Sequence, residues 1–203
     1  IHKVVMPNSA ETTYIKKYII AASELLYDGW IYLSPFGWDA GSATSFKVLQ
    51  FEGWALTQDS VARLQFKCLR PGDPLTHVCF NLLATKDNGS TAVDAGGRYV
   101  CTHGTQDTLK LATNTGRWLR IKLYWQAESV VGAADGVYNC ELFDADGTTL
   151  LGDTMTVPSS KLTGVLPIQR LLVPLTHTGT YNTGDTAVPT LYFADETIYD
   201  SVD

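Results

Sequence analysis

Apolar and polar residues alternate along several short stretches of this chain, a pattern typical of β-strands with one buried face. In the stretch 61–69 the polar positions of the alternation are Arg63, Gln65 and Lys67. A segment rich in Pro and Gly follows at 70–74, and an apolar run comes after it at 78–83. Because a segment of that composition turns the chain sharply, we predict that the two stretches form an antiparallel hairpin.

The stretch 118–126 shows the same alternation and is the second clear amphipathic strand. One predicted face carries Leu119, Ile121, Leu123 and Trp125, and the other carries Arg120, Lys122, Tyr124 and Gln126. An amphipathic strand of this kind fits a sheet that buries one side and leaves the other in water.

Further strand-like runs lie between clusters of Gly, Pro, Asn and Asp. They cover 98–102, 137–143 and 190–199. The run 137–143 is followed by a turn at 144–147 and a return strand at 148–151. The segment 14–26 has a weak helical pattern, but its β-branched and aromatic residues favour a strand or a short mixed segment. Helical periodicity of useful length is otherwise nearly absent, so the sequence predicts an all-β fold.

Composition limits the classes of protein that fit. The 203 residues are 45% hydrophobic and 18% charged, enough for one core, and no repeat or linker divides them, so we expect a single domain over 1–203. Residues 1–28 could be an N-terminal arm or an edge element. A formal charge of −6 disfavours nucleic acid, and no apolar stretch approaches the roughly 20 residues of a membrane span. Because the chain opens at Ile1 without a leader, we expect a processed product of extracellular or virion-surface origin.

The four cysteines are Cys68, Cys79, Cys101 and Cys140. They lack the spacing of a zinc site, so we predict no metal and no cofactor. Two disulfides are compatible with an even count, and Cys68–Cys79 is favoured because both residues lie in the predicted hairpin, although four buried thiols are an equal alternative. Asp144 and Asp146 resemble part of a calcium loop, but the distant Glu of such loops is missing and a hairpin turn is predicted instead.

Three segments carry a resemblance to a known superfamily. They are GRWLRIKL at 116–123, ADGVY at 134–138 with the turn DADG at 144–147, and LYFADETI at 191–198. Their order resembles the concanavalin A-like superfamily, in particular its laminin-G-like and polysaccharide-lyase-like members. The resemblance implies a two-sheet antiparallel jelly-roll sandwich and a function connected with carbohydrate.

Catalytic signatures of that superfamily are missing. No Glu-x-Asp-x-x-Glu run supplies the paired carboxylates of a sandwich glucanase, and the nearest counterpart of the lyase motif Arg-x-Glu-x-Arg, at 63–67, lacks the central carboxylate. His77, His103 and His177 stand alone in predicted turns, where a surface or structural role is favoured over a general base. We therefore predict no catalytic residue.

A candidate binding face follows if 61–69 and 118–126 line the same sheet. It would comprise Arg63, Gln65, Lys67, Arg120, Lys122 and Tyr124. Such a basic face could attract an anionic polysaccharide, with Tyr124 stacking on a sugar ring, but a solvated sheet face has the same composition. Trp30, Trp38 and Trp54 lie among glycines, where they could be stacking platforms or core anchors.

Three functions remain open. The first is a non-catalytic, lectin-like carbohydrate-binding domain. The second is a structural subunit of an extracellular filament or a virion or tail assembly, in which the apolar segment 18–32 could pair with a neighbouring chain. The third is a jelly-roll polysaccharide lyase or glycoside hydrolase.

Overall fold

The computed structural model describes residues 1–5, 13–35, 45–53, 60–68, 78–84, 114–130, 133, 135–157, 168–175, 177–178 and 190–199. Side chains are described for 1, 3, 22–35, 48–49, 114–130, 133, 135–156 and 190–199. The strands are β1 His2–Val5, β2 Thr13–Ala22, β3 Glu24–Leu33, β4 Ser45–Gly53, β5 Ser60–Cys68, β6 Val78–Ala84, β7 Trp118–Gln126, β8 Val137–Phe143, β9 Met155–Val157, β10 Ile168–Leu175, β11 His177–Thr178 and β12 Thr190–Tyr199. Within these ranges no helix has the length and apolarity to cross a membrane.

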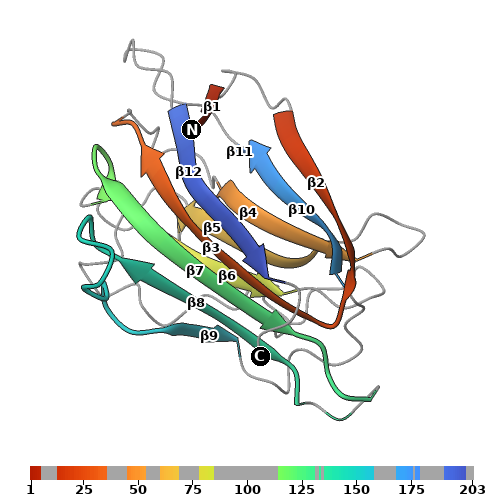
Figure 1. Cartoon of the computed structure of the whole chain (residues 1–203). Coiled ribbons are helices and arrows are strands. Elements are labelled where there is room, and N and C mark those ends of the chain that lie inside the picture. Colours follow the sequence, from red (N-terminus) through yellow and green to blue (C-terminus); the bar gives the residue numbers. More distant parts are fainter. Residues whose placement is uncertain are drawn as a thin grey trace.

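The strands form two antiparallel sheets that lie in two layers (Figure 1). Sheet A, in front in Figure 1, has the order β1-β12-β3-β7-β8-β9. Sheet B, behind it, has the order β2-β10-β4-β5-β6, with β11 paired to β4. The predicted all-β antiparallel sandwich is therefore confirmed.

The chain crosses repeatedly between the two sheets, as in a jelly roll. It passes from β2 in sheet B to β3 in sheet A, back to β4–β6, again to β7–β9, and finally through β10 and β11 to β12. The last strand thereby lies between the first strand and β3, with Phe193 opposite His2 on one side and Ile31 on the other. Sheet A thus joins segments from both ends and the middle of the sequence.

Most predicted strands are confirmed with small changes at their ends. The strands expected at 118–126, 137–143 and 190–199 coincide with β7, β8 and β12. The hairpin expected from 61–69 and 78–83 is β5 paired with β6, and 14–26 forms β2 and the start of β3. The return at 148–151 is a single bridge, Phe143–Leu150, rather than a strand. The strand expected at 98–102 lies outside the described residues.

The inner face of sheet A is buried and apolar because every second residue of its central strands is apolar. Its fully buried members include Leu25, Ile31, Ile121, Leu123, Trp125, Tyr138 and Phe193. Burying a side chain of this kind stabilises the folded state by about 1.5–3 kcal/mol, so this face supplies much of the driving force for folding.

A bulge in β12 gives one buried hydroxyl a polar partner. The register shifts between Ala194 and Thr197, where Asp195 has a φ of 49°. The Tyr27 hydroxyl, on the buried face, donates to Glu196 Oε1 at 3.0 Å. A Cβ at Gly29 would meet that hydroxyl at 2.7 Å, so glycine makes room for the ring. Burial, reinforced by the Glu196 charge, raises the pKa of Tyr27.

One sequence-based hypothesis about the strands is wrong. The strands β5 and β7 belong to different sheets, so the residues Arg63, Gln65 and Lys67 do not share a sheet face with Arg120, Lys122 and Tyr124. Local alternation does not reveal the sheet that a strand joins.

The segment 18–32, which was expected to pair with another chain, is divided between two strands. Residues 24–32 lie in β3, which is paired on both edges, with β12 and β7. Residues 18–22 lie in β2, and for them the pairing stays a prediction.

The predicted Cys68–Cys79 bridge stays a prediction, because the side chains of both residues lie outside the described set. The register pairs Cys68 with Val78 and Lys67 with Cys79, so the two cysteines are offset by one residue. Cys140 is buried in the core of sheet A, and Cys101 lies outside the described residues.

Candidate functional site

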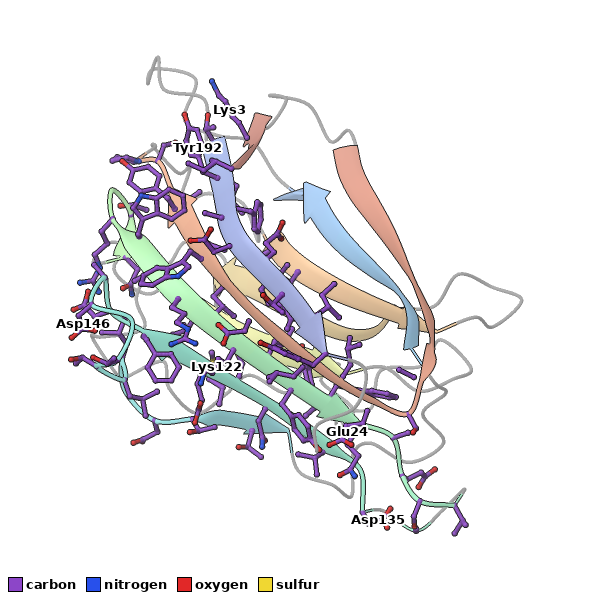
Figure 2. All side chains as sticks on the ribbon, viewed as in Figure 1. Lys3, Glu24, Lys122, Asp135, Asp146 and Tyr192 are labelled. Carbon is purple, nitrogen blue, oxygen red and sulfur yellow. The ribbon has the colours of Figure 1, made fainter. Side chains whose placement is uncertain are left out.

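The outer face of sheet A, turned away from sheet B, carries the partly exposed residues of the alternation. They are Glu24, Leu26, Asp28, Trp30 and Tyr32 from β3, Trp118, Arg120, Lys122, Tyr124 and Gln126 from β7, Val137, Asn139, Glu141 and Phe143 from β8, and Thr190, Tyr192 and Ala194 from β12. Figure 2 shows this face, with Lys3 and Tyr192 at one end and Glu24 at the other.

An aromatic cluster occupies the first end. The Tyr32 ring lies 5.6 Å from the Trp118 ring and 5.8 Å from the Tyr192 ring, at interplanar angles of 54° and 73°. Lys3 Nζ lies 5.9 Å from the centre of the Tyr192 ring. Because these rings meet at steep angles, they pack on each other and tie β12, β3 and β7 together instead of forming one flat platform.

A group that we call the turn-side cluster lies next to it: Asp28, Trp30, Arg120 and Gly147. The Arg120 guanidinium donates to both Asp28 oxygens at 2.8 and 2.7 Å and to the Gly147 carbonyl oxygen at 3.1 Å. Gly147 has a φ of 72°, and a Cβ there would meet the Trp30 ring at 2.9 Å. The turn 144–149 is therefore docked on β3 and β7, and Trp30 anchors it.

Acidic side chains of that turn are also used within the protein. Asp144 pairs with Arg117 at 2.9 Å, and Asp146 accepts from the backbone amides of Thr148 and Thr149 and from the Thr149 hydroxyl. These hydrogen bonds, that of the Thr149 hydroxyl foremost, lower the pKa of Asp146 to about 2. The structure thus has a turn at 144–147, which was predicted in preference to a calcium loop. The described residues contain no group of three metal-ligating side chains.

A shallow cavity of about 190 Å³ opens farther along the same face. It is lined by Leu26, Lys122, Tyr124, Asn139, Glu141 and Thr154, and we call it the pocket. The register explains the lining, because Tyr124 stands between Leu26 and Asn139, and Lys122 stands opposite Glu141. The pocket is smaller than the roughly 300–1,000 Å³ of drug-sized ligand sites, so it fits one small ring or side group.

Polar groups of the pocket are incompletely bonded within the protein. The Lys122 ammonium lies 5.6 Å from the Phe143 ring centre, and no hydrogen bond or ion pair joins it to another described residue. From the described side chains, Glu141 accepts one hydrogen bond, donated by the Thr154 hydroxyl at 3.1 Å. Asn139 Oδ1 is inaccessible to solvent and has no hydrogen-bond partner. An unsatisfied buried acceptor costs about 1–3 kcal/mol, which a donating ligand recovers once the Asn139 amide turns its oxygen towards the pocket.

Tyr124 closes one side of the pocket and is held by Glu24. Its hydroxyl donates to Glu24 Oε1 at 2.5 Å. Burial, followed by the bond to the Glu24 carboxylate, raises the pKa of Tyr124 to about 12. Tyr124 is therefore protonated at neutral pH and is unsuited to act as a general base.

The structure divides the predicted site residues into three groups. Lys122 and Tyr124 line the pocket, whereas Arg120 lies on the same face but belongs to the turn-side cluster. Arg63, Gln65 and Lys67 lie on β5 of sheet B, and their side chains are outside the described set.

Other candidate residues are placed only in part. Trp30 is a partly exposed anchor of the turn, whereas Trp38 and Trp54 lie outside the described residues. His77 and His103 also lie outside them, and His177 begins β11 opposite Phe46.

Sequence reasoning missed Leu26, Asn139, Glu141 and Thr154. The alternation of 137–143 contained a usable signal, since it assigns Asn139 and Glu141 to the polar face of a strand. Leu26 and Thr154 carried no such signal, because only the pairing of β3 and β9 with their neighbours brings them to this place.

Comparisons with known proteins bear on the fold. No family model and no curated protein matches the sequence. Among solved structures, the chain is similar to the cellulose induced protein Cip1, with a TM-score of 0.55 and 15% identity over 98% of this chain and 78% of that one. It is also similar to the alginate lyase from Klebsiella pneumoniae, with a TM-score of 0.51 and 10% identity over 89% of this chain and 61%, less than two thirds, of the lyase. At these identities the two likenesses show a shared sandwich fold and no more.

Proposed function

We propose that this protein binds carbohydrate without catalysis, through the pocket on the outer face of sheet A. The observation that carries the proposal is the set of incompletely bonded polar groups on Lys122, Asn139 and Glu141 around the apolar side chain of Leu26. A sugar ring has apolar C–H faces and a rim of hydroxyls that both donate and accept hydrogen bonds. The pocket offers a complement to both features.

Carboxylate spacing supports binding over hydrolysis. Glycosidases hold two carboxyl groups about 5–5.5 or 6.5–9.5 Å apart. Glu24 lies opposite Gln126 on β7, which in turn lies opposite Val137 on β8. Glu141 lies four residues along β8 from Val137. The carboxylates of Glu24 and Glu141 are therefore separated by about 14 Å along the strand and by two strand spacings. Asp28 stands in the same cross-strand row as Glu141, but both of its oxygens bind Arg120. Neither Glu24 nor Asp28 is therefore arranged with Glu141 for glycoside cleavage.

Fold likeness adds a weaker argument. The similar structures carry names that refer to cellulose and alginate. At 10% and 15% identity the likeness concerns the fold, and a jelly roll supports many functions. The chemistry of the pocket, rather than these names, therefore indicates the ligand.

The proposal is tested by calorimetric titration of soluble polysaccharides, neutral and acidic, into the wild type and two lysine variants. Lys122→Met removes the ammonium from the pocket. Lys3→Met is the matched control, since it also removes one positive charge and one cation–π contact, at the far end of the same face. We expect wild-type binding to at least one polymer, about tenfold weaker binding by Lys122→Met, and unchanged binding by Lys3→Met. A wild type that binds no polymer, or a Lys122→Met variant that binds equally well, refutes the proposal.

Self-assembly is a second candidate function, favoured by one observation. Strand β2 is ten residues long and, within the described part of sheet B, pairs only with β10. An unpaired strand edge of that length can pair with another chain. Light scattering after size-exclusion chromatography would reveal such an assembly, and replacing Ile15 by Pro in β2 should dissociate it. A wild type that is monomeric at high concentration rules this candidate out.

A further inference from the structure

We infer that the pocket takes a neutral, hydroxyl-bearing sugar and discriminates against uronate and sulfated sugars. This inference rests on the proposed function and specifies the chemical class of its ligand. It replaces the anionic polysaccharide suggested by the sequence, because the basic face behind that suggestion is divided between two sheets.

Charge near the pocket is the first argument. The pocket and its rim hold the carboxylates of Glu141 and Glu24, against the single ammonium of Lys122. The neighbouring Arg120 is neutralised by a two-point contact with Asp28. An acidic sugar would therefore meet a net negative site on a protein with a formal charge of −6, and repulsion would weaken its binding.

Hydrogen-bonding capacity is the second argument. Asn139 Oδ1 is a solvent-inaccessible acceptor without a donor, and Glu141 has acceptor capacity beyond its bond from Thr154. Both groups favour a ligand that donates. A hydroxyl donates and accepts, whereas an ionised carboxylate or sulfate placed against these acceptors only accepts and would leave them unsatisfied.

Register is the third argument. Lys122 and Glu141 are direct cross-strand neighbours on β7 and β8, where side chains on the same face lie about 5 Å apart at their Cβ atoms. Two adjacent hydroxyls of one ring can use such a pair, one accepting from the ammonium and the other donating to the carboxylate. Leu26 and the Tyr124 ring, across the pocket, can contact the apolar face of the same ring.

The test uses pairs of polymers that share a backbone and differ only in charge. Each uronate polymer, such as alginate or polygalacturonate, is compared by calorimetry with its carboxyl-reduced form, in which hydroxymethyl replaces carboxylate. A panel of natural neutral glycans accompanies the pairs. We expect binding to neutral or reduced polymers at least tenfold tighter than to the parent uronates. Affinity should change little between low and high salt, where the Debye length falls from about 30 Å to about 3 Å.

Glu141→Gln separates charge from shape. This variant removes one negative charge from the pocket and keeps one oxygen acceptor, so the ratio of uronate affinity to neutral-sugar affinity should rise about tenfold over that of the wild type. Tighter, salt-sensitive binding of the uronate member of a pair by the wild type overturns the inference and leaves the proposed function standing. A wild type that binds no member of the panel removes both.

Discussion

The turn-side cluster and the pocket lie on the same face of sheet A, built on the same strands, yet their polar groups are used differently. Arg120 donates three hydrogen bonds to two partners, whereas Lys122, two residues farther along β7, makes only a ring contact among the described residues. Polar groups that satisfy each other stabilise the fold. Polar groups left with spare bonding capacity beside a cavity are available to a ligand.

The position of one turn accounts for the difference. Gly147, in the turn after β8, accepts a hydrogen bond from Arg120 and packs closely against Trp30. Lys122 instead lies opposite Glu141 of β8. Two basic residues of one amphipathic strand therefore have separate roles. We predict that substitutions in the turn-side cluster affect stability and that substitutions in the pocket affect binding.

The largest effect is expected for Gly147→Ala. A left-handed φ costs a non-glycine residue about 1–2 kcal/mol, and contact with Trp30 at 2.9 Å adds an overpacking cost of about 1–3 kcal/mol. Thermal and urea denaturation should show the summed loss in the free energy of unfolding. Gly116→Ala is the matched control, since its φ is 77° but its Cβ would meet Pro35 at an ordinary 3.4 Å. Equal losses for the two variants would mean that the Trp30 contact has no part in the effect.

Asp28→Ala should have the next largest effect. It removes both acceptors of the Arg120 guanidinium, whose side chain is 30% exposed, and charge-assisted bonds of this kind contribute about 1.5–3 kcal/mol. Urea denaturation measures the loss, and affinity for neutral carbohydrate should not change. A loss below about 0.5 kcal/mol, which is typical of a surface ion pair, would contradict the structural role given to this cluster.

Asn139→Leu should change stability and binding in opposite directions. Replacing an unsatisfied buried acceptor by an apolar group of similar size should raise the free energy of unfolding by about 1 kcal/mol. The same change removes a ligand contact, so affinity should fall about tenfold. Thr156→Val, at the residue opposite Asn139 on β9, is the control and should alter neither quantity. Lower stability with unchanged affinity would show that Asn139 serves the fold alone.

The smallest effect concerns the pH dependence set by Tyr124. Its pKa is raised to about 12, so its contribution to stability is complete below the unfolded value of about 10 and is lost as the pH rises through about 12. In Glu24→Gln the pKa should move back towards 10, because the carboxylate that favours the protonated phenol is gone. Carbon NMR of the Tyr124 ring through an alkaline titration measures both values, and an unchanged pKa in Glu24→Gln would exclude Glu24 as a cause.

The sequence predicted the strands better than the site. Alternation located β7 to the residue, because side-chain direction in a strand depends only on position within that strand. It separated Arg120, Lys122 and Tyr124 from the core, which the structure confirms. The candidate site was less predictable, because Arg63 and Arg120 have the same local pattern but lie in different sheets. Leu26 and Asn139 meet only because β3 and β8 both pair with β7, which lies about a hundred residues after β3 in the sequence.

The sequence alone determined that this chain forms amphipathic strands, where several of them run, and which residues of those strands turn towards water. Tertiary structure alone decided which strands are neighbours, which of the outward charges neutralise one another, and where a polar cavity remains. The physical reason is that alternation and turn chemistry act over a few residues, whereas sheet order and ion pairing depend on contacts between distant segments. Lys122 and Arg120 therefore have the same local pattern in the sequence. Only the fold pairs Arg120 with Asp28 and places Lys122 beside a pocket.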